Sequence, residues 1–445
     1  MTTRATSLLR QLGIGSATAL VISNMIGTGI FTTSGFLAGQ LGSAKLLLSI
    51  WGVGAVCALA GAFCYSELGV NFPSSGGEYV YLTEAYGPTW GFMTGWISFF
   101  AGFSAPIAAA ALAFSDYLGH VVASSSWESK LGGAQILASA IIVLFTIVNC
   151  LGIRRTARVQ NVLTSLKILI ILAFLIIGFA FGQGSWENFT HPAVRTSITP
   201  LFAQFFVSLF YIYVSYSGWN AATYVAEEVK HPARTLPLSL AFGTALVAAL
   251  FIGLNVLFIY AVPLESMKGV VAVGALAAQH LFGPAVAGVF SAAMALSLLA
   301  TVNAEVTIGP RVYYAMAKNG AFFSMAAKVD PRWHTPVIAI LCQGVCAILM
   351  TVVPFLSLLL YIGLLLNFFA VLSVGSLFIF RKRPGWQKLG AVSFAYPLVP
   401  AFFVAVGVYM TILGVMLRPG VSAIAVLTVA AGAAIYHFRL RIKTA

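Results

Sequence analysis

Charged residues are scarce in this chain. Only 8% of its 445 residues are Asp, Glu, Lys or Arg, whereas 60% are hydrophobic. A soluble globular domain carries about 25% charged residues, so a water-soluble enzyme of this length is excluded. The mean hydropathy of +0.97 supports the same exclusion.

The sequence also lacks the patterns typical of a metal centre, a disulfide framework or ATP hydrolysis. Its five cysteines lie in apolar runs without a CxxC pair, which predicts free packing thiols. Its six histidines are scattered near predicted helix ends or loops, without ligand spacing. No GxxxxGK[ST] motif occurs. We therefore expect no metal, no cofactor and no direct drive by ATP.

A membrane-embedded enzyme is the second class that the sequence disfavours. Such an enzyme would need His, Asp or Ser/Lys groups clustered at one depth of the membrane. The eleven acidic residues and six histidines form no such cluster. We therefore expect that the protein is not an enzyme. A sensor or scaffold without transport is a third class, and no appended signalling domain supports it.

Twelve apolar segments are long enough to cross a membrane, since a spanning helix needs about 20 apolar residues. Their predicted bounds are 13–40, 46–69, 88–120, 134–152, 159–183, 199–229, 237–262, 283–315, 336–354, 356–380, 396–417 and 420–438. The first segment has no small-residue cleavage site, so it reads as a retained helix. The sequence predicts an all-α polytopic membrane protein in the lipid bilayer.

The net charge is +13. Because the basic residues lie in short loops between apolar segments, they indicate the orientation of the chain in the membrane and not nucleic-acid binding. With the N-terminus in the cytoplasm, 18 of the 24 Lys and Arg residues fall in inner loops or termini. Cytoplasmic loops of membrane proteins carry such an excess. The pattern predicts a multi-pass protein of the cell (inner) membrane with both termini cytoplasmic.

Two predicted spans are interrupted in matching positions. The first contains Gly27 and Gly29 at mid-membrane, and the sixth contains the polar run 215–220. The two spans are five apart, so segments 1–5 and 6–10 would be inverted repeats. Interrupted helices in corresponding positions of two halves indicate a transporter binding site. Close helix packing through small residues is the alternative explanation for the glycines.

Several motifs in the expected order resemble the amino acid–polyamine–organocation superfamily, in particular its L-type amino acid transporter branch and bacterial relatives. They are Met25-Ile-Gly-Thr-Gly-Ile-Phe31, Tyr65-Ser-Glu-Leu68, Pro73-Ser-Ser-Gly-Gly-Glu-Tyr-Val-Tyr81, Glu84-Ala-Tyr-Gly-Pro88, Arg158-Val-Gln160 with Lys167, Tyr216-Ser-Gly-Trp-Asn220, Glu227-Glu228 with Pro232, and Gly309-Pro-Arg-Val-Tyr-Tyr-Ala-Met316.

This resemblance implies a LeuT-type fold with helices 1 and 6 broken. Residues 13–183 would form the first five-helix repeat and 199–380 the second, inverted repeat, with two extra helices in 396–438. It also implies sodium-independent, secondary active transport of amino acids by exchange or proton-linked uptake. The short loops are compatible with a monomer.

The physical chemistry of an amino acid fits the two interrupted helices. Its carboxylate and ammonium are both costly to bring into apolar surroundings. Helix N-termini offer free N–H groups and helix C-termini offer free carbonyls. The centres of spans 1 and 6 contain no charged side chain, so helix ends would match both charges.

The resemblance implies which residues of the two breaks bind substrate. The N–H groups of Gly27, Thr28 and Gly29 would bind the carboxylate, and the carbonyls of Met25, Val214 and Ser217 would bind the ammonium. The other predicted substrate-binding residues in the breaks are Ile26, Tyr216 and Gly218. Helix packing remains an alternative for Tyr216.

One position departs from the pattern of the family. Many members have an aromatic gating residue where this chain has Val214. Tyr213 and Tyr216 are both candidates to replace it, and the size of the admitted side chain depends on that choice.

Ionisable residues within predicted spans are candidates for coupling. Lys167 lies in span 5, where the resemblance implies a built-in cation in place of sodium, with Ser297 of span 8 as a neighbour. Glu305 lies further along span 8. The alternatives are snorkelling of Lys167 to the inner face and pairing of Glu305 with an inner-loop arginine.

The lack of acids at mid-depth favours a neutral L-amino acid as substrate. A polyamine or cationic amino acid, carried by a transporter or antiporter, is the alternative. Such a substrate would need an acidic group facing its side chain.

Overall fold

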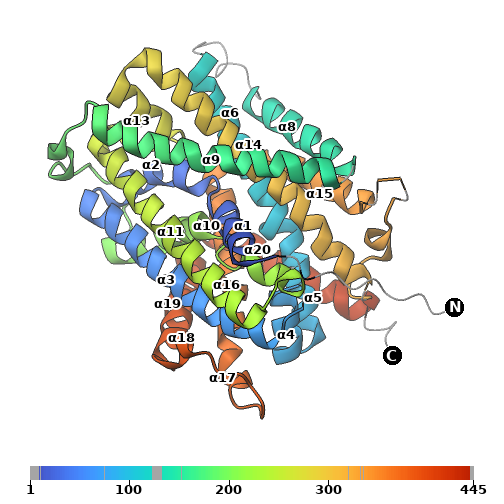
Figure 1. The fold of residues 1–445 in the computed structure, drawn as a ribbon. Coiled ribbons are helices and arrows are strands. Elements are labelled where there is room, and N and C mark those ends of the chain that lie inside the picture. Colours follow the sequence, from blue (N-terminus) through green and yellow to red (C-terminus); the bar gives the residue numbers. More distant parts are fainter. Residues whose placement is uncertain are drawn as a thin grey trace.

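The computed structural model of the chain describes residues 10–440 apart from 11, 75, 123–132, 152, 319, 331 and 334. Helices dominate this part of the chain (Figure 1). Those of the first half are α1 (Ile14–Met25), α2 (Gly29–Leu41), α3 (Ala44–Asn71), α4 (Glu78–Tyr86), α5 (Pro88–Ile97), the π-helix η1 (Ser98–Ser104), α6 (Ala105–Val122), α8 (Gly133–Cys150) and α9 (Ile153–Phe181).

The second half begins with a short 3-10 helix and ends with a π-helix. Its elements are η2 (Trp186–Phe189), α10 (Leu201–Tyr216), η3 (Ala221–Glu228), α11 (Pro232–Ala261), α12 (Leu264–Met267), α13 (Val273–Phe282), α14 (Pro284–Lys318), η4 (Ser324–Ala327), α15 (Val337–Met350), α16 (Phe355–Gly375), α17 (Leu377–Phe380), α18 (Gly390–Ser393), α19 (Leu398–Leu417), α20 (Pro419–Ile435) and η5 (Tyr436–Leu440).

Most predicted spans are present as long apolar helices. Within the described residues, 10 segments are long and apolar enough to cross a membrane, and the bent pair of α10 and η3 is an eleventh. The span predicted at 336–354 is the 14-residue helix α15, which is shorter than a membrane crossing requires. The chain is a multi-pass membrane protein, and the count of twelve spans stays a prediction.

The outer helices turn apolar side chains outward, as contact with lipid requires. On α9, Val162, Leu169 and Ile176 are seven residues apart and each is at least 63% exposed. Lys167 and Phe174 of the same helix are buried. The helix therefore has one exposed apolar face and one face that is buried in the protein interior.

The broken first segment lies inside the helical assembly. Helix α1 packs against α11, α2 packs against α10, and α3 packs against both α10 and α11. A second group, formed by α6, α8, α9, α14 and α15, packs together beside these helices. Both α1 and α10 therefore lie near the centre of the ribbon (Figure 1).

A single tyrosine connects three elements at one end of the assembly. The Tyr117 hydroxyl of α6 donates to the Phe31 carbonyl of α2 at 2.8 Å. It also accepts the Gly274 N–H of α13 at 3.0 Å. The start of α2, beside the break, is therefore connected to both α6 and α13.

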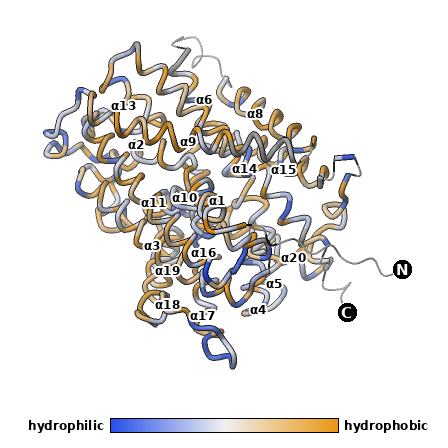
Figure 2. The backbone as a smooth tube through the Cα atoms, viewed as in Figure 1, coloured by the Kyte–Doolittle hydropathy of each residue, from blue (hydrophilic) through white to orange (hydrophobic). Residues whose placement is uncertain are grey.

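Hydrophilic residues gather in the connecting segments, and the helices are mainly hydrophobic. Figure 2 shows this contrast most clearly in the loop that follows α17. That loop contains Arg381, Lys382, Arg383 and Lys388. It lies at the end of the assembly that holds α4, since Arg383 donates to the Glu84 carbonyl at 2.8 Å.

Candidate functional site

The first transmembrane segment is interrupted between α1 and α2, as predicted. Helix α1 ends at Met25 and α2 begins at Gly29. The Gly27 N–H donates to the Met25 carbonyl at 2.9 Å, outside the helical pattern. The N–H groups of Thr28 and Gly29 have no backbone acceptor among the described residues, because the first N–H groups of a helix have no partner within it.

The sixth segment is interrupted in the same way. Helix α10 ends at Tyr216 and η3 begins at Ala221, and the two are bent by 43°. Gly218 has a φ of 100°, a left-handed conformation that glycine adopts without steric cost. The Ser217 N–H donates to the Val214 carbonyl at 3.1 Å.

The two breaks lie directly against each other. A Cβ atom at Gly218 would lie 2.7 Å from the carbonyl carbon of Asn24, and a Cβ atom at Gly29 would overlap Ser215. The hydroxyl oxygens of Ser215 and Thr33 are 3.1 Å apart. The close approach of the first and sixth segments therefore requires glycine at positions 29 and 218.

Gly27 differs from its two neighbours in the breaks. A Cβ atom there would lie 3.7 Å from the Thr301 methyl carbon, which is an ordinary contact. The close packing between the breaks therefore does not explain Gly27. The packing explanation of the sequence pattern holds for Gly29 and Gly218.

The breaks provide both kinds of backbone group that a zwitterion needs. Open N–H groups stand at the start of α2. The Ser217 carbonyl, at the end of α10, has no backbone partner among the described residues. The carbonyls of Met25 and Val214 each accept one bond already, and each carbonyl oxygen has a second lone pair. The arrangement can bind an anion and a cation side by side.

The side chains at the breaks are mainly engaged in packing. The Tyr216 ring lies 5.7 Å from Trp51 and 5.2 Å from Phe251, and its hydroxyl donates to the Trp51 carbonyl at 3.2 Å. Its side chain therefore belongs to the core of the protein. Val214 is half-buried in the last turn of α10, and the Tyr213 hydroxyl donates to the Leu366 carbonyl at 3.4 Å.

Lys167 connects α9 to the break in the first segment. Its side chain is 1% exposed. Its ammonium donates to the Ile26 carbonyl at 2.5 Å and to Thr301 Oγ1 at 3.0 Å. Nearby, the hydroxyl oxygens of Ser23 and Thr164 are 3.0 Å apart. The alternative in which Lys167 snorkels to the surface is wrong, because its ammonium is buried among protein acceptors.

The neighbour that α14 provides for Lys167 is Thr301, which sequence reasoning missed. The predicted neighbour, Ser297, donates to the Met294 carbonyl of its own helix at 2.7 Å. Glu305 lies one turn beyond Thr301, is half-buried, and interacts electrostatically with Lys167. The i, i+4 spacing of positions 297, 301 and 305 was the available signal, since these positions share one helix face.

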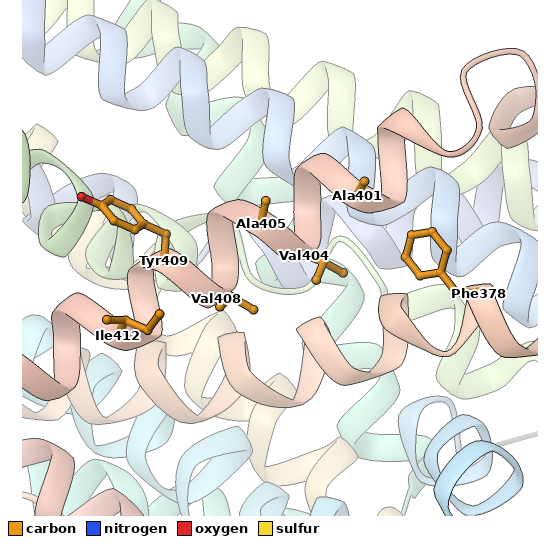
Figure 3. Close-up of a pocket in the computed structure, with 7 residues that line it drawn as sticks. All are labelled: Phe378, Ala401, Val404, Ala405, Val408, Tyr409 and Ile412. Atoms are coloured by element: carbon orange, nitrogen blue, oxygen red, sulfur yellow. The ribbon is translucent and has the colours of Figure 1, made fainter.

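A groove on the outside of α19 is a poor candidate for an amino acid site. Its volume is about 550 Å³, and Figure 3 shows side chains of α17 and α19 along it. The lining residues are Phe378, Ala401, Val404, Ala405, Val408, Tyr409 and Ile412. A zwitterion in such apolar surroundings would leave both charges unpaired.

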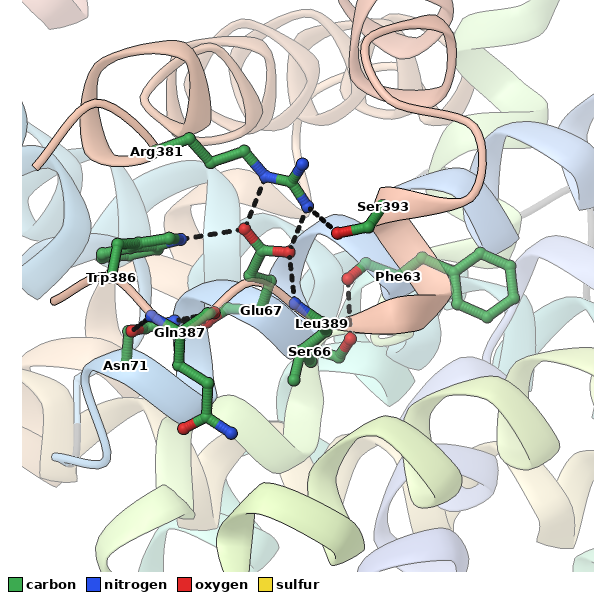
Figure 4. A network of polar contacts seen from close by, with 9 residues as sticks. All are labelled: Phe63, Ser66, Glu67, Asn71, Arg381, Trp386, Gln387, Leu389 and Ser393. Atoms are coloured by element: carbon green, nitrogen blue, oxygen red, sulfur yellow. Dashed lines mark hydrogen bonds and ion pairs between the residues drawn. The ribbon is translucent and has the colours of Figure 1, made fainter.

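A buried ion pair connects α3 to the loop after α17 (Figure 4). The Arg381 guanidinium donates to both carboxylate oxygens of Glu67, at 2.7 and 2.6 Å. The same carboxylate accepts the Trp386 indole N–H at 2.8 Å and the Leu389 N–H at 3.0 Å. This network holds the end of the assembly that contains α4.

Comparison with known proteins agrees with the geometry. The family model described as "Amino acid permease" matches residues 12–435. The chain belongs to the amino acid permease family. The serine/threonine exchanger SteT of Bacillus subtilis (strain 168) is 30% identical over 412 residues, which are 91% of either chain.

Two animal proteins show similar likeness over the whole chain. The large neutral amino acids transporter small subunit 2 of Mus musculus is 28% identical, over 97% of this chain and 81% of its own. The Asc-type amino acid transporter 1 of Mus musculus is 27% identical, with the same two coverages. The proteins that resemble this family member are therefore membrane transporters.

A solved structure confirms the fold class. MhsT in complex with L-phenylalanine superimposes with a TM-score of 0.60 and 14% sequence identity, covering 94% of this chain and 98% of that chain. At this identity the likeness shows the fold alone. The LeuT-type architecture with its two interrupted helices is therefore confirmed.

Proposed function

We propose that this family member is a secondary transporter of neutral L-amino acids and not an enzyme. One observation carries the proposal: two helix breaks in contact offer open N–H groups and carbonyls without any charged side chain in the breaks. An amino acid carries one negative and one positive charge, and these helix ends match both. The printed names of the relatives support the same class of substrate.

The roles at the breaks follow from the helix ends. The N–H groups of Gly27, Thr28 and Gly29 bind the substrate carboxylate, and the first of these must leave the Met25 carbonyl to do so. The ammonium is bound by the carbonyls of Met25, Val214 and Ser217. The remaining residues of the proposed site, Ile26, Tyr216 and Gly218, contribute backbone, because the Tyr216 ring is packed in the core.

We place the coupling machinery at the contact of α9, α1 and α14. The Lys167 ammonium is a fixed cation between the first break and α14, which makes transport independent of sodium. Glu305 sets the electrostatic surroundings of that cation. Ser297 belongs to the same helix face and acts through the packing of α14. Exchange and proton-linked uptake are both compatible with this arrangement.

The topology that we propose follows the positive charges. The excess of arginines and lysines supports a location of α4 and of the loop after α17 at the cytoplasmic side of the cell (inner) membrane. Both termini are then cytoplasmic. Residues 13–183 and 199–380 are proposed as the inverted repeats, with 396–438 as the additional pair of helices.

Uptake into proteoliposomes tests the function. Radiolabelled neutral amino acids are offered with and without unlabelled amino acid inside, in sodium-free and sodium-containing buffer, with and without a proton gradient. We expect sodium-independent uptake that internal substrate accelerates. Substrate analogues that lack the α-carboxylate or the α-amine should not compete. Strong competition by decarboxylated amines would contradict the proposal and favour a polyamine substrate.

A further inference from the structure

Glu78 is a buried carboxylate that the proposed transport machinery does not use. It begins α4, and the residue is 8% exposed. Its Oε1 atom accepts the Tyr65 hydroxyl at 2.6 Å and the Asn220 amide at 3.1 Å. Tyr65 lies on α3, and Asn220 lies at the start of η3. One carboxyl oxygen therefore joins three elements.

The joined elements meet directly beside the break in the sixth segment. Asn220 follows Trp219, the last residue but one of the break, and the Trp219 ring lies 4.7 Å from the Tyr65 ring. The Asn220 amide lies 3.2 Å from the Tyr224 hydroxyl. The Gly76 N–H donates to the Tyr224 carbonyl at 3.4 Å. The segment before α4 and the start of η3 thus close this side of the break together.

The groups that face Glu78 are neutral donors. Those from the elements packed around it are the hydroxyls of Tyr65, Tyr81, Tyr213 and Tyr224 and the amide of Asn220. Among the described residues, no cation offsets the effect of burial on this carboxyl. The nearby Glu67, by contrast, is paired with Arg381.

Burial without a cation disfavours the ionised carboxylate. Burial raises the pKa of Glu78 to about 7, against the opposing effect of the hydrogen bonds from Tyr65 and Asn220. A solvated glutamate has a pKa of about 4.3. The packed arrangement therefore holds a proton on Glu78 under conditions in which an exposed Glu78 would have released it.

We propose that Glu78 is a positioning residue for the break in the sixth segment, and that its protonated form holds the cytoplasmic side of the substrate site closed. The inference rests on the proposed transport function. Closure packs Glu78 against Tyr65 and Asn220, and the carboxylate takes up one proton from the cytoplasm. Opening exposes the carboxyl to water, and the proton returns to the cytoplasm.

The sign of the pH dependence follows from this exchange. The closed form binds a proton that the open form releases, so closure is most favoured below the open-form pKa of about 4.3 and is weakened as the pH rises from there through about 7. Well above that pH both forms are ionised and closure changes little further. Between pH 6 and pH 8 the ionised fraction of a group with a pKa near 7 rises about tenfold. Cytoplasmic acidification therefore slows opening, and alkalinisation accelerates it.

The test is amino acid counterflow in proteoliposomes of known orientation. The pH on the side that α4 faces is varied from 6 to 8, and the other side is held at 7. For the wild type we expect a several-fold rise in exchange rate with pH. For Glu78→Gln, which keeps a carbonyl acceptor but cannot ionise, we expect a flat profile. Glu78→Asp should restore a slope.

Two further variants distinguish positioning from simple structural damage. Tyr65→Phe removes a donor that stabilises the carboxylate, so the profile should move to higher pH without becoming flat. Glu84→Gln makes the same charge change on the exposed side of α4, where the side chain is 50% exposed, and should leave the profile as in the wild type.

Each outcome decides one question. A wild type that exchanges no neutral amino acid contradicts the proposed function itself. A wild type that exchanges amino acid without any dependence on cytoplasmic pH overturns the inference about Glu78. So does a Glu78→Gln variant that keeps the wild-type slope, because the slope would then belong to another group. Should Glu78→Gln not yield folded protein, the shift of the Tyr65→Phe profile decides, and an unshifted profile overturns the inference.

Discussion

Removal of the Glu67 carboxylate should destabilise the protein strongly. The Glu67 side chain is fully buried and that of Arg381 is 6% exposed. Glu67→Ala leaves the guanidinium without its counter-ion, and the N–H groups of Trp386 and Leu389 lose their acceptor. Breaking a buried ion pair by removing one partner costs about 3–5 kcal/mol. We expect a loss of stability in that range.

A second ion pair at the same end of the protein serves as the control. Glu84 and Arg383 lie 3.7 Å apart, and their side chains are 50% and 43% exposed. Exposed pairs contribute about 0–1 kcal/mol. Glu84→Ala should therefore change stability little, although it also removes a glutamate that pairs with an arginine of the loop after α17.

Equilibrium unfolding in mixed micelles measures both variants by tryptophan fluorescence. The double variant Glu67→Ala/Arg381→Met should recover part of the loss, since it leaves no buried charge unpaired. The coupling between the two sites then follows from the double-mutant cycle. If Glu67→Ala costs no more than Glu84→Ala, the reasoning from burial is refuted.

Three further predictions concern the transport site, and uptake by purified variants checks each of them. Gly29→Ala should reduce transport more than tenfold, because its Cβ overlaps Ser215, whereas Gly27→Ala should stay within about twofold; equal effects would contradict the packing argument. Lys167→Ala should lower transport at least about tenfold, since hydrogen bonds to a charged group contribute about 1.5–3 kcal/mol each. Substrate binding should decrease less than transport, and full activity would exclude a coupling role. Glu305→Gln should alter the pH response more than substrate preference, and the reverse result would place Glu305 in the substrate pocket.

The interrupted helices were predictable because their signal is local. Gly27 and Gly29 interrupt an apolar run, and the run Ser215–Asn220 interrupts another, so each break is visible within about eight residues of sequence. The absence of charges near them indicated how a zwitterion could be bound. Both breaks are present in the structure, and the fold class is confirmed.

Contacts between distant segments were not predictable from one sequence. Thr301 belongs to no recognisable motif. It nevertheless accepts a hydrogen bond from the Lys167 ammonium, although the two residues are 134 positions apart in the sequence. Glu67 belongs to the Tyr65–Leu68 motif, but its partner Arg381 lies 314 positions away in the sequence. Side-chain pairing of this kind depends on which helix faces meet, and hydrophobic periodicity does not specify that choice in an apolar chain.

The Tyr117 hydroxyl makes the movements of α2 and α13 depend on each other. Its oxygen donates one hydrogen bond to α2 and accepts one from α13, so both elements depend on a single atom held by α6. Withdrawal of α2 frees the only proton of that hydroxyl, and withdrawal of α13 frees the Gly274 N–H. In either case water must enter to form a hydrogen bond with the freed group. Once present, the water can also replace the remaining hydrogen bond of the Tyr117 hydroxyl. Departure of α2 and α13 from α6 should therefore be concerted, as one wetting event and not as two independent openings.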